Sequence, residues 1–280
     1  MTNRPKTPAS AIAEARSKGV ARLDAELMLA RILARPRTWL IAHDDAVLLD
    51  TQAADWEKWL GRRAAGEPLA YLLGEKEFSG LMLDVTADVL VPRPETELLV
   101  EWADELLRGR LEAAAVLDLG TGTGAIALAI KSRHASAIVT ATDNSAEALV
   151  VARGNAARHA LVVEFIEAAW WCGLEGRRFD LVVSNPPYIA GGDPALVDLR
   201  HEPVTALTPG RDGTAALASI ASGSAAHLRP GGWLLLEHGF AQGPAVRDLL
   251  HRNALAAIET RRDLAGHERA SGGRQAGRPS

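Results

Sequence analysis

The segment AVLDLGTGTGAIALAIK, residues 115–131, contains the transition that decides the fold. A short apolar run leads into three closely spaced glycines and then into a second apolar run with helical spacing. Glycine permits the tight turn needed here and lets a ligand approach the backbone N–H groups at the start of a helix. We therefore interpret the turn as a ligand-binding loop made of Gly120, Thr121, Gly122, Thr123 and Gly124.

The sequence on both sides of this loop alternates between helical and strand-like segments. Glu95–Arg108 has helical spacing, and four runs read as buried strands: Ala115–Leu119, Ala137–Thr142, Asp180–Ser184 and Trp233–Glu237. Such alternation is typical of an open, mostly parallel sheet with helices on both faces. We therefore predict an α/β fold with a Rossmann-like domain over residues 95–280. The small, polar segment 271–280 is expected to be a frayed tail.

The first part of the chain follows a different pattern. Helical spacing recurs there without strand signals, in Pro8–Gly19, Arg22–Arg35, Asp50–Arg63 and Pro68–Leu73. This pattern predicts a small helical bundle over residues 1–75. Next, Phe78–Val91 shows short β-type runs around the turn Thr86–Asp88, which predicts a β-hairpin linker over residues 76–94.

Two acidic residues accompany the glycine loop. Asp143 follows a predicted strand about 20 residues after the loop, where a carboxylate can accept both ribose hydroxyls of a nucleoside ligand. Asp118 ends the preceding strand, and an acid there suits a ligand with an ammonium group, such as S-adenosylmethionine, better than a pyrophosphate. With Ala125 in the last place the loop also satisfies the dinucleotide pattern. NAD therefore remains an alternative to S-adenosylmethionine at this point.

The segment VVSNPPYIA, residues 182–190, ends a later strand with an unusual corner, Asn185, Pro186, Pro187 and Tyr188. Ligands of such sheets bind at the carboxyl ends of the strands. The prolines have a fixed φ and no N–H, so the turn is stiff and its carbonyls stay available. The Asn185 side-chain oxygen and the Pro186 carbonyl can then accept both hydrogens of a planar NH2 group. Tyr188 would pack against that group.

This corner suits methyl transfer to a planar NH2 nitrogen. An amide nitrogen is a poor nucleophile, so close placement against the methyl group must supply much of the rate, roughly 7–11 kcal/mol. Positive charge developing on the nitrogen strengthens its bonds to the two acceptor oxygens. We predict the catalytic and substrate-binding residues to be Asn185, Pro186, Pro187 and Tyr188. No metal site is predicted, because the histidines and Cys172 lack ligand spacing.

With these motifs the sequence resembles the class I S-adenosylmethionine-dependent methyltransferases that act on planar NH2 groups, which include adenine-N6 and protein glutamine-N5 methyltransferases. Pro68–Glu101, and above all VPRPETE at Val91–Glu97, resembles the linker of bacterial release factor glutamine methyltransferases. Leu228–Gly243 and Arg262–Arg269 are similar to the last part of the same family. The resemblance covers nearly the whole chain and is weakest in the first helices.

The resemblance implies methylation of N5 of the glutamine in the Gly-Gly-Gln loop of class I peptide-chain release factors, with S-adenosyl-L-methionine as methyl donor. Gly120–Gly124 and Asp143 would hold the cofactor, Asn185 would line both sites, and the bundle would recognise the substrate. Trp170 would lie beside the adenine, although Ala169 stands where the family has a small polar or acidic residue, and Trp171 stays an alternative. A ribosomal-protein glutamine and an adenine in nucleic acid stay alternative substrates.

The composition fits a globular protein with an ordinary core: 280 residues, 48% hydrophobic and 24% charged. The net charge of −4 argues against broad nucleic-acid binding. The single cysteine excludes an internal disulfide, and neither a signal peptide nor a membrane span is indicated. We therefore expect a cytoplasmic monomer that binds neither nucleic acid nor membrane.

Five residues near the motifs receive no catalytic role. We expect Arg93 and Glu95 to form a salt-bridged hinge, and Glu237 to be solvated at its strand end. His238 is interpreted as a surface or satisfied histidine, and Cys172 as a small packed side chain.

Overall fold

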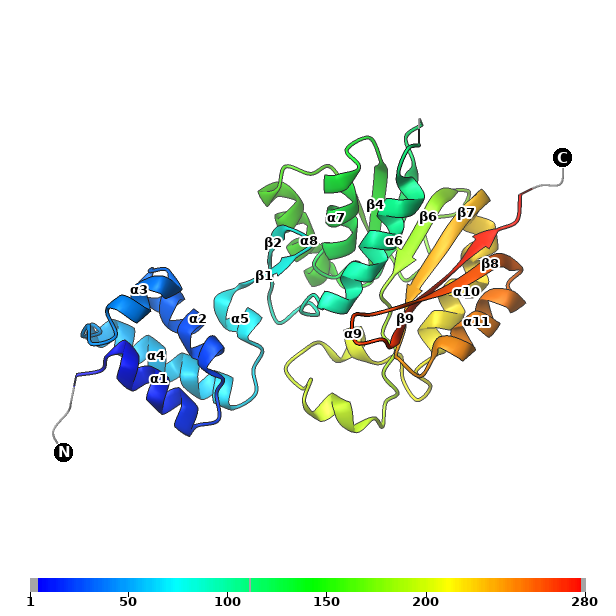
Figure 1. Ribbon diagram of the computed structural model, residues 1–280. Coiled ribbons are helices and arrows are strands. Elements are labelled where there is room, and N and C mark those ends of the chain that lie inside the picture. The colour runs from blue at the N-terminus through cyan, green and yellow to red at the C-terminus, as the bar shows by residue number, and fades with distance from the viewer. Residues whose placement is uncertain (1–4, 111, 278–280) are drawn as a thin grey trace. The chain divides into compact units, whose positions relative to one another are not determined.

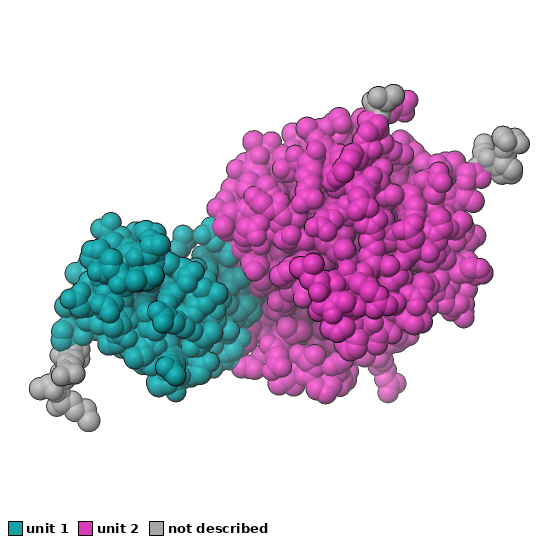
Figure 2. Space-filling model, in the orientation of Figure 1, with its two compact units in different colours: residues 1–75 teal, residues 76–280 magenta. Residues whose placement is uncertain are grey.

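The computed structural model describes residues 5–110 and 112–277. By its internal contacts the chain divides into two compact units, residues 1–75 and residues 76–280 (Figures 1 and 2).

The first unit is helical, as the spacing predicts. Its helices are α1 Pro8–Ser17, α2 Arg22–Leu33, α3 Arg37–Ala42, α4 Asp50–Ala64 and α5 Leu69–Leu73. Their apolar faces enclose one core in which Met28, Leu29, Trp56 and Leu60 are fully buried. The predicted N-terminal helical region is therefore confirmed, and α3 is a further short helix that the sequence pattern did not indicate.

A small hairpin follows these helices. β1, Glu75–Phe78, pairs with β2, Leu81–Asp84. Ser79 and Gly80 between them have φ angles of 50° and 85°, and two positive φ angles are what a two-residue hairpin turn requires. The hairpin is confirmed, but its predicted position around Thr86–Asp88 is wrong. Those residues form a separate turn, in which the Thr86 hydroxyl donates to Asp88.

The second unit is built on a seven-stranded sheet in the order β5-β4-β3-β6-β7-β9-β8 (Figure 1). Neighbours from β5 to β7 are parallel, and β9 is antiparallel to both β7 and β8. The strands are β3 Ala115–Leu119, β4 Ile138–Asp143, β5 Glu164–Glu167, β6 Phe179–Ser184, β7 Leu228–Glu237, β8 Leu255–Arg262 and β9 Glu268–Gln275. The predicted α/β fold with a mostly parallel sheet is confirmed.

Helices cover both faces of this sheet. They are α6 Glu97–Leu107, α7 Ala125–Arg133, α8 Ala146–Arg158, α9 Val204–Leu207, α10 Ala215–His227 and α11 Gly243–Arg252, with 3-10 turns η1 Pro94–Thr96 and η2 Pro194–Val197. Since side chains alternate along a strand, Val116 packs into the core beneath α6 and α7, and Leu117 into the core beneath α10 and α11. Within residues 5–110 and 112–277, no helix is long and apolar enough to cross a membrane.

The prediction of a frayed tail is wrong for Ser271–Gln275, which belong to β9. Glycine is common in flexible tails, but here it serves close packing. A Cβ on Gly272 would lie 2.5 Å from the Leu235 side chain and 2.9 Å from that of Trp102. Both side chains can lie this close to residue 272 only because it has no side chain of its own. The last residues of the predicted tail, 278–280, lie outside the described residues.

Asn155 of α8 joins the hairpin to the glycine loop. Its Nδ2 donates to the carbonyl oxygens of Asp84 and Thr123 at 3.0 and 2.9 Å, and its Oδ1 accepts from the Asp84 N–H at 2.7 Å. The side chain is fully buried, so these bonds are made where water cannot replace them. Asn155 therefore holds the end of β2 against the backbone of the loop.

Replacing Asn155 by leucine, which is similar in size, should lower the free energy of unfolding by about 2–4 kcal/mol, because the partners stay buried without a bond. Urea unfolding followed by circular dichroism measures the loss. The exposed Asn144 is the matched control, and Asn144→Leu should change stability by less than about 0.5 kcal/mol. An Asn155→Leu protein that unfolds at the wild-type urea concentration would contradict this account.

Candidate active site

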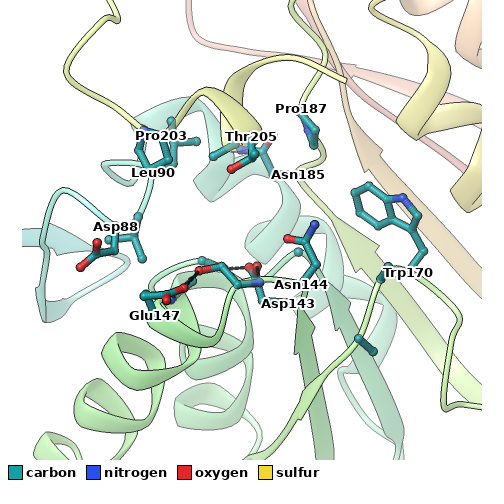
Figure 3. Close-up of a pocket in the computed structure, with 18 of the residues that line it drawn as sticks. Asp88, Leu90, Asp143, Asn144, Glu147, Trp170, Asn185, Pro187, Pro203 and Thr205 are labelled. Carbon is teal, nitrogen blue, oxygen red and sulfur yellow. Dashed lines mark hydrogen bonds between the residues drawn. The ribbon is translucent and has the colours of Figure 1, made fainter. Parts of the chain in front are cut away.

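The order of the strands reverses between β3 and β6, and a cavity of about 320 Å³ opens at the carboxyl ends of β3, β4 and β6. Reversal points of this kind are where open α/β sheets bind ligands, and the volume is that of a small-molecule site. In Figure 3, Asp143 and Asn144 lie along one side of the cavity, with Trp170 and Asn185 across from them. The segment Ala87–Leu90 and residues Pro203, Thr205 and Ala206 complete the wall.

The glycine loop forms part of this wall. Gly120, Gly122 and Gly124 have φ angles of 73°, 54° and 83°, which glycine adopts without strain. Only Gly120 and Gly122 of the predicted loop line the cavity. Thr121 and Thr123 are buried and support the loop from below.

Asp143 lies at the cavity as predicted. Its Oδ2 accepts from the Gly122 N–H at 2.8 Å, and its Oδ1 accepts from the Ser145 N–H at 3.0 Å. Burial raises its pKa, and these backbone bonds oppose the rise. Each oxygen keeps a further lone pair, so the carboxylate can also accept two ligand hydroxyls.

Asp118 does not line the cavity, and its predicted contact to a ligand ammonium group stays a prediction. The side chain is fully buried, and its Oδ2 accepts from the Thr121 hydroxyl at 2.6 Å and from the Ala127 N–H at 3.2 Å. Burial raises the pKa of Asp118 to about 7. Through Oδ2 the residue links the glycine loop to the first turn of α7, and its buried Oδ1 has no partner among the described residues.

The two adjacent tryptophans have different surroundings. Trp170 lines the cavity beside the glycine loop, and a Cβ built on Gly120 would lie 3.5 Å from its ring. Trp171 instead donates to the carbonyl oxygens of Ser219 and Ile220, both at 3.2 Å, and stacks on His227. Of the two alternatives, Trp170 is therefore the residue that can pack against a ligand.

A second cavity, of about 260 Å³, adjoins the first. Asn185 and Pro187 line both cavities, whereas Pro186 and Tyr188 line only the second. The structure thus brings the four predicted corner residues together at the wall between two cavities. The other residues of the second cavity include Arg93, Glu95, Leu199, Leu207 and Arg269.

Behind the corner lies a buried polar cluster. Asn185 Nδ2 donates to the Thr96 hydroxyl oxygen at 3.1 Å, and the Tyr188 hydroxyl donates to Glu237 Oε1 at 3.3 Å. Glu237 is fully buried, so the expectation of a solvated strand end is wrong. Burial raises the pKa of Glu237 to about 7, against the opposing effect of Thr96, Arg269 and Tyr188.

The structure confirms the expectation for His238 but not the one for Cys172. His238 is fully buried, and its ring nitrogens contact the Gly239 carbonyl oxygen and the Ser271 hydroxyl at 2.9 and 2.8 Å. It is a satisfied histidine, as expected. Cys172 is exposed, so the expectation of a packed side chain is wrong.

A polar clasp holds together the two segments that cover both cavities. Leu90 and Ala206 line both, and next to them Glu202 pairs with Arg93 and accepts from the Val91 N–H at 3.0 Å. The expected hinge of Arg93 and Glu95 is not what the structure shows, but the expected salt bridge of Arg93 is present. Its partner, which is 2% exposed at the side chain, could not be identified from a local pattern.

The sequence reasoning missed Thr96, Glu202, Glu237 and Arg269. A signal existed for Thr96, Glu237 and Arg269, since all three lie in segments that resemble the family, but nothing in the spacing separates them from their neighbours. Among the described residues, no group of three or more histidine, cysteine or acidic side chains is placed to hold a metal ion.

Comparison with known proteins gives a consistent result. Residues 93–210 match the family described as "Methyltransferase small domain", and residues 9–74 match "PrmC N-terminal domain". The chain is 50% identical over 258 residues to the release factor glutamine methyltransferase of Bordetella pertussis, covering 91% of this chain and 95% of that protein. It is 48% identical over 285 residues to the protein of the same name from Burkholderia pseudomallei, covering 99% of each.

Solved structures share the fold at low sequence identity. A methyltransferase from Pyrococcus furiosus superimposes with a TM-score of 0.53 at 20% identity, over 70% of this chain and 90% of that one. The 16S rRNA N2 G1207 methyltransferase of T. thermophilus, in complex with AdoMet and guanosine, gives the same TM-score and identity over 72% of this chain and 49% of that one. These likenesses show the class I methyltransferase fold.

Arg93→Met should lower the free energy of unfolding by about 1–3 kcal/mol, because Glu202 loses its ionic partner. The loss is smaller than for a fully buried pair, since Arg93 is 34% exposed and water partly compensates. In urea unfolding, the double variant Arg93→Met/Glu202→Gln should regain part of the loss, since no charge is then left alone. A double variant less stable than either single variant would show that the two residues do not act as a pair.

Proposed function

The chain belongs to the release factor glutamine methyltransferases, and we propose that it methylates the side-chain nitrogen N5 of the Gly-Gly-Gln glutamine in class I peptide-chain release factors. It is an S-adenosylmethionine-dependent methyltransferase. The observation that carries the proposal is the position of Asn185, whose side chain lines a nucleoside-sized cavity and an adjoining second cavity. A methyl donor in the first and an amide in the second would meet at this residue.

The residues of the first cavity fit S-adenosylmethionine. Asp143 offers two oxygens to the ribose hydroxyls, Trp170 offers a ring face to the adenine, and the loop at Gly120 and Gly122 offers close approach to backbone. NAD, the alternative that the loop pattern left open, does not fit a chain that belongs to a methyltransferase family. When bound, S-adenosylmethionine supplies an electrophilic methyl group.

The Asn185–Pro186 corner positions the nucleophile. The Asn185 Oδ1 and the Pro186 carbonyl oxygen accept the two hydrogens of the glutamine amide, which directs the nitrogen towards the first cavity. Both bonds strengthen as positive charge develops on the nitrogen, so they stabilise the transition state more than the ground state. Neither proline has an N–H that would compete for these oxygens.

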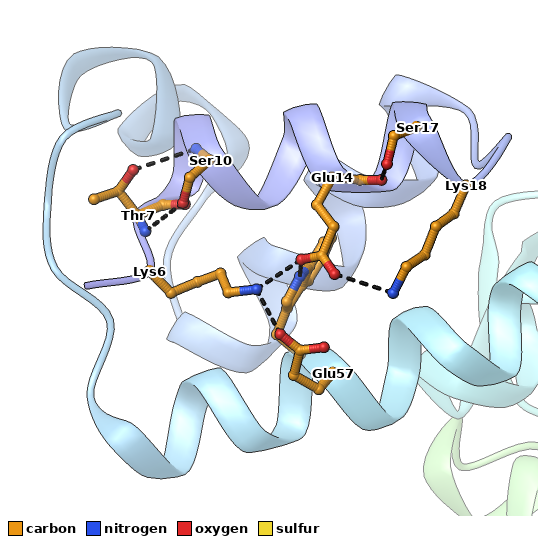
Figure 4. Close-up of polar contacts among 8 residues, drawn as sticks. Lys6, Thr7, Ser10, Glu14, Ser17, Lys18 and Glu57 are labelled. Atoms are coloured by element: carbon orange, nitrogen blue, oxygen red, sulfur yellow. Dashed lines mark hydrogen bonds and ion pairs between the residues drawn. The ribbon is translucent and has the colours of Figure 1, made fainter. Parts of the chain in front are cut away.

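The first unit is the proposed recognition domain for the release factor. Its charged residues near α1 pair with one another: Glu14 accepts from Lys6, Lys18 and the Trp56 indole, and Lys6 also pairs with Glu57 (Figure 4). These charges hold the bundle together. The loop before α4 instead exposes the apolar side chains of Val47 and Leu49, and Ile41 of α3 is also exposed. We propose that these three contact the protein substrate.

A planar NH2 on a nucleic-acid base remains the second candidate, because the exocyclic amine of adenine and the side-chain amide of glutamine both offer two hydrogens. The net charge of −4 favours a protein substrate over a nucleic acid. We also propose that the protein acts as a cytoplasmic monomer.

The first test is methyl transfer from labelled S-adenosylmethionine to a purified, unmodified bacterial release factor. Label should appear on the loop glutamine in peptide mass spectrometry and disappear when that glutamine is replaced. No label on the release factor, with cofactor binding intact by calorimetry, would overturn the proposed substrate.

Asn185→Ala should lower turnover by at least about 100-fold and leave cofactor affinity largely intact, because it removes one preorganised acceptor. Asp143→Ala is the opposite control and should weaken cofactor binding by about 1.5–3 kcal/mol, the scale of hydrogen bonds to a charged group. Turnover at saturating cofactor and calorimetric titration measure the two effects. If Asn185→Ala abolished cofactor binding, its assignment to the substrate side would be wrong.

A further inference from the structure

Four side chains from separate segments meet behind the Asn185 corner. Thr96 comes from η1, Tyr188 from the loop after β6, Glu237 from the end of β7 and Arg269 from β9. Thr96 and Glu237 are 4% and 1% exposed, so neither contacts the contents of a cavity. They reach the reaction only through Asn185 and Tyr188.

The hydrogen-bond capacities of this cluster fix the direction of each bond. Tyr188 can donate only one proton, and it gives that proton to Glu237 Oε1. The Thr96 hydroxyl lies close enough to lower the pKa of Glu237. In the described part of the chain, Glu237 Oε2 has no partner at full hydrogen-bond geometry. Glu237 thus keeps an unused acceptor oxygen in the same buried cluster as the Thr96 hydroxyl, to which we assign the Thr96 proton.

A threonine hydroxyl has one proton and two lone pairs. If its proton points to Glu237, only its lone pairs remain for Asn185, and they can accept from Nδ2 but cannot bind Oδ1. The NH2 end of the Asn185 amide then faces Thr96, and the oxygen end faces the wall between the cavities. With the amide turned over, two NH2 groups would face each other there, and the substrate would lose an acceptor.

We propose that Thr96 and Glu237 are positioning residues for methyl transfer: the Glu237 carboxylate orients the Thr96 hydroxyl, and Thr96 holds the Asn185 amide with its oxygen towards the substrate nitrogen. This inference rests on the proposed function. It assigns a role to a threonine of the linker and to a glutamate on β7, neither of which borders the reacting atoms.

The same arrangement makes turnover depend on pH. As the pH falls through about 7, the pKa to which burial raises Glu237, the carboxyl group gains a proton, becomes a weaker acceptor and can itself donate to the Thr96 hydroxyl oxygen. The Thr96 proton is then free to turn to Asn185 Oδ1. The other charged or titratable groups acting on Glu237 are Tyr188, Arg269 and Glu95. Arg269 and Tyr188 favour the carboxylate, and Glu95 opposes it.

The kinetic test uses kcat at saturating cofactor, so that titration of Asp143 does not enter. Thr96→Val should lower kcat by about 10- to 100-fold, the effect of a misplaced reacting group, with cofactor affinity within about twofold of wild type. Thr96→Ser, which keeps the hydroxyl, should restore most of kcat. An unchanged kcat in Thr96→Val, or a Thr96→Ser protein as impaired as Thr96→Val, would overturn the proposal.

The pH arm compares two carboxylates near the second cavity. In the wild type kcat should decline on the acid side of about pH 7. Glu237→Gln should remove that limb, whereas Glu95→Gln should keep it and move it to lower pH, because Glu95 raises the pKa of Glu237. A limb that persists in Glu237→Gln would overturn the coupling of Glu237 to turnover.

A third arm needs no substrate and so separates this inference from the proposed function. Selective 15N labelling of the asparagines, which are Asn3, Asn144, Asn155, Asn185 and Asn253, gives side-chain amide resonances that Asn185→Ala assigns. The Asn185 NH2 signal should shift between pH 6 and 8, and this shift should vanish in Glu237→Gln and in Thr96→Val. A signal indifferent to pH and to both substitutions overturns the positioning role, even if release factors are methylated. The expected shifts, with no methylated release factor, would support the positioning and reject only the substrate.

Discussion

Placing β6 beside β3, and not beside β5, is the constraint on which the site depends. After β5 the chain must return across the sheet, and this return brings the carboxyl end of β6 next to those of β3 and β4. The glycine loop, Asp143 and the Asn185 corner each end one of these strands. They are separated in sequence by tens of residues, and only the strand order makes them neighbours. The loop is fixed across this edge because the N–H groups of Gly120 and Thr121 both donate to the Thr142 carbonyl oxygen at 2.9 Å.

The linker segment VPRPETE gives the site its second layer. Arg93 pairs with Glu202 of the covering segment, Thr96 accepts from Asn185, and Glu97 accepts from the Ser79 N–H of the hairpin at 3.1 Å. Three residues of one short segment thus hold three different parts of the second unit.

Features with a local cause could be predicted from the sequence. The glycine loop and the Asn185–Tyr188 corner could be predicted because glycine and proline have special backbone conformations. Asp143 could be predicted because short apolar runs show where the strands end.

Trp170 was expected at the ligand, but the sequence could not distinguish it from Trp171. That distinction depends on α10, to which Trp171 donates its hydrogen bonds. Asp118 was placed at the ligand because its strand position is right, yet its side chain turns under the loop. The burial of Glu202 and Glu237 could not be predicted, because burial of a carboxylate depends on partners distant in the chain. The hairpin turn was predicted at Thr86–Asp88 instead of Ser79–Gly80, because the residue types at Ser79–Gly80 gave a weaker turn signal.

β9 is made after β8 but inserted between β8 and β7. During synthesis, therefore, β7 cannot complete its pairing with the strand that emerges next, and its outer edge stays open until Glu268–Gln275 has left the ribosome. An open edge strand invites pairing with other chains, and a sheet finished out of order is exposed to this risk for longer than one that grows by simple addition. β7 also carries Glu237, so the buried cluster behind the reacting corner is among the last parts of the molecule to assemble. A nascent chain can thus have a formed glycine loop while the support of Asn185 is still incomplete.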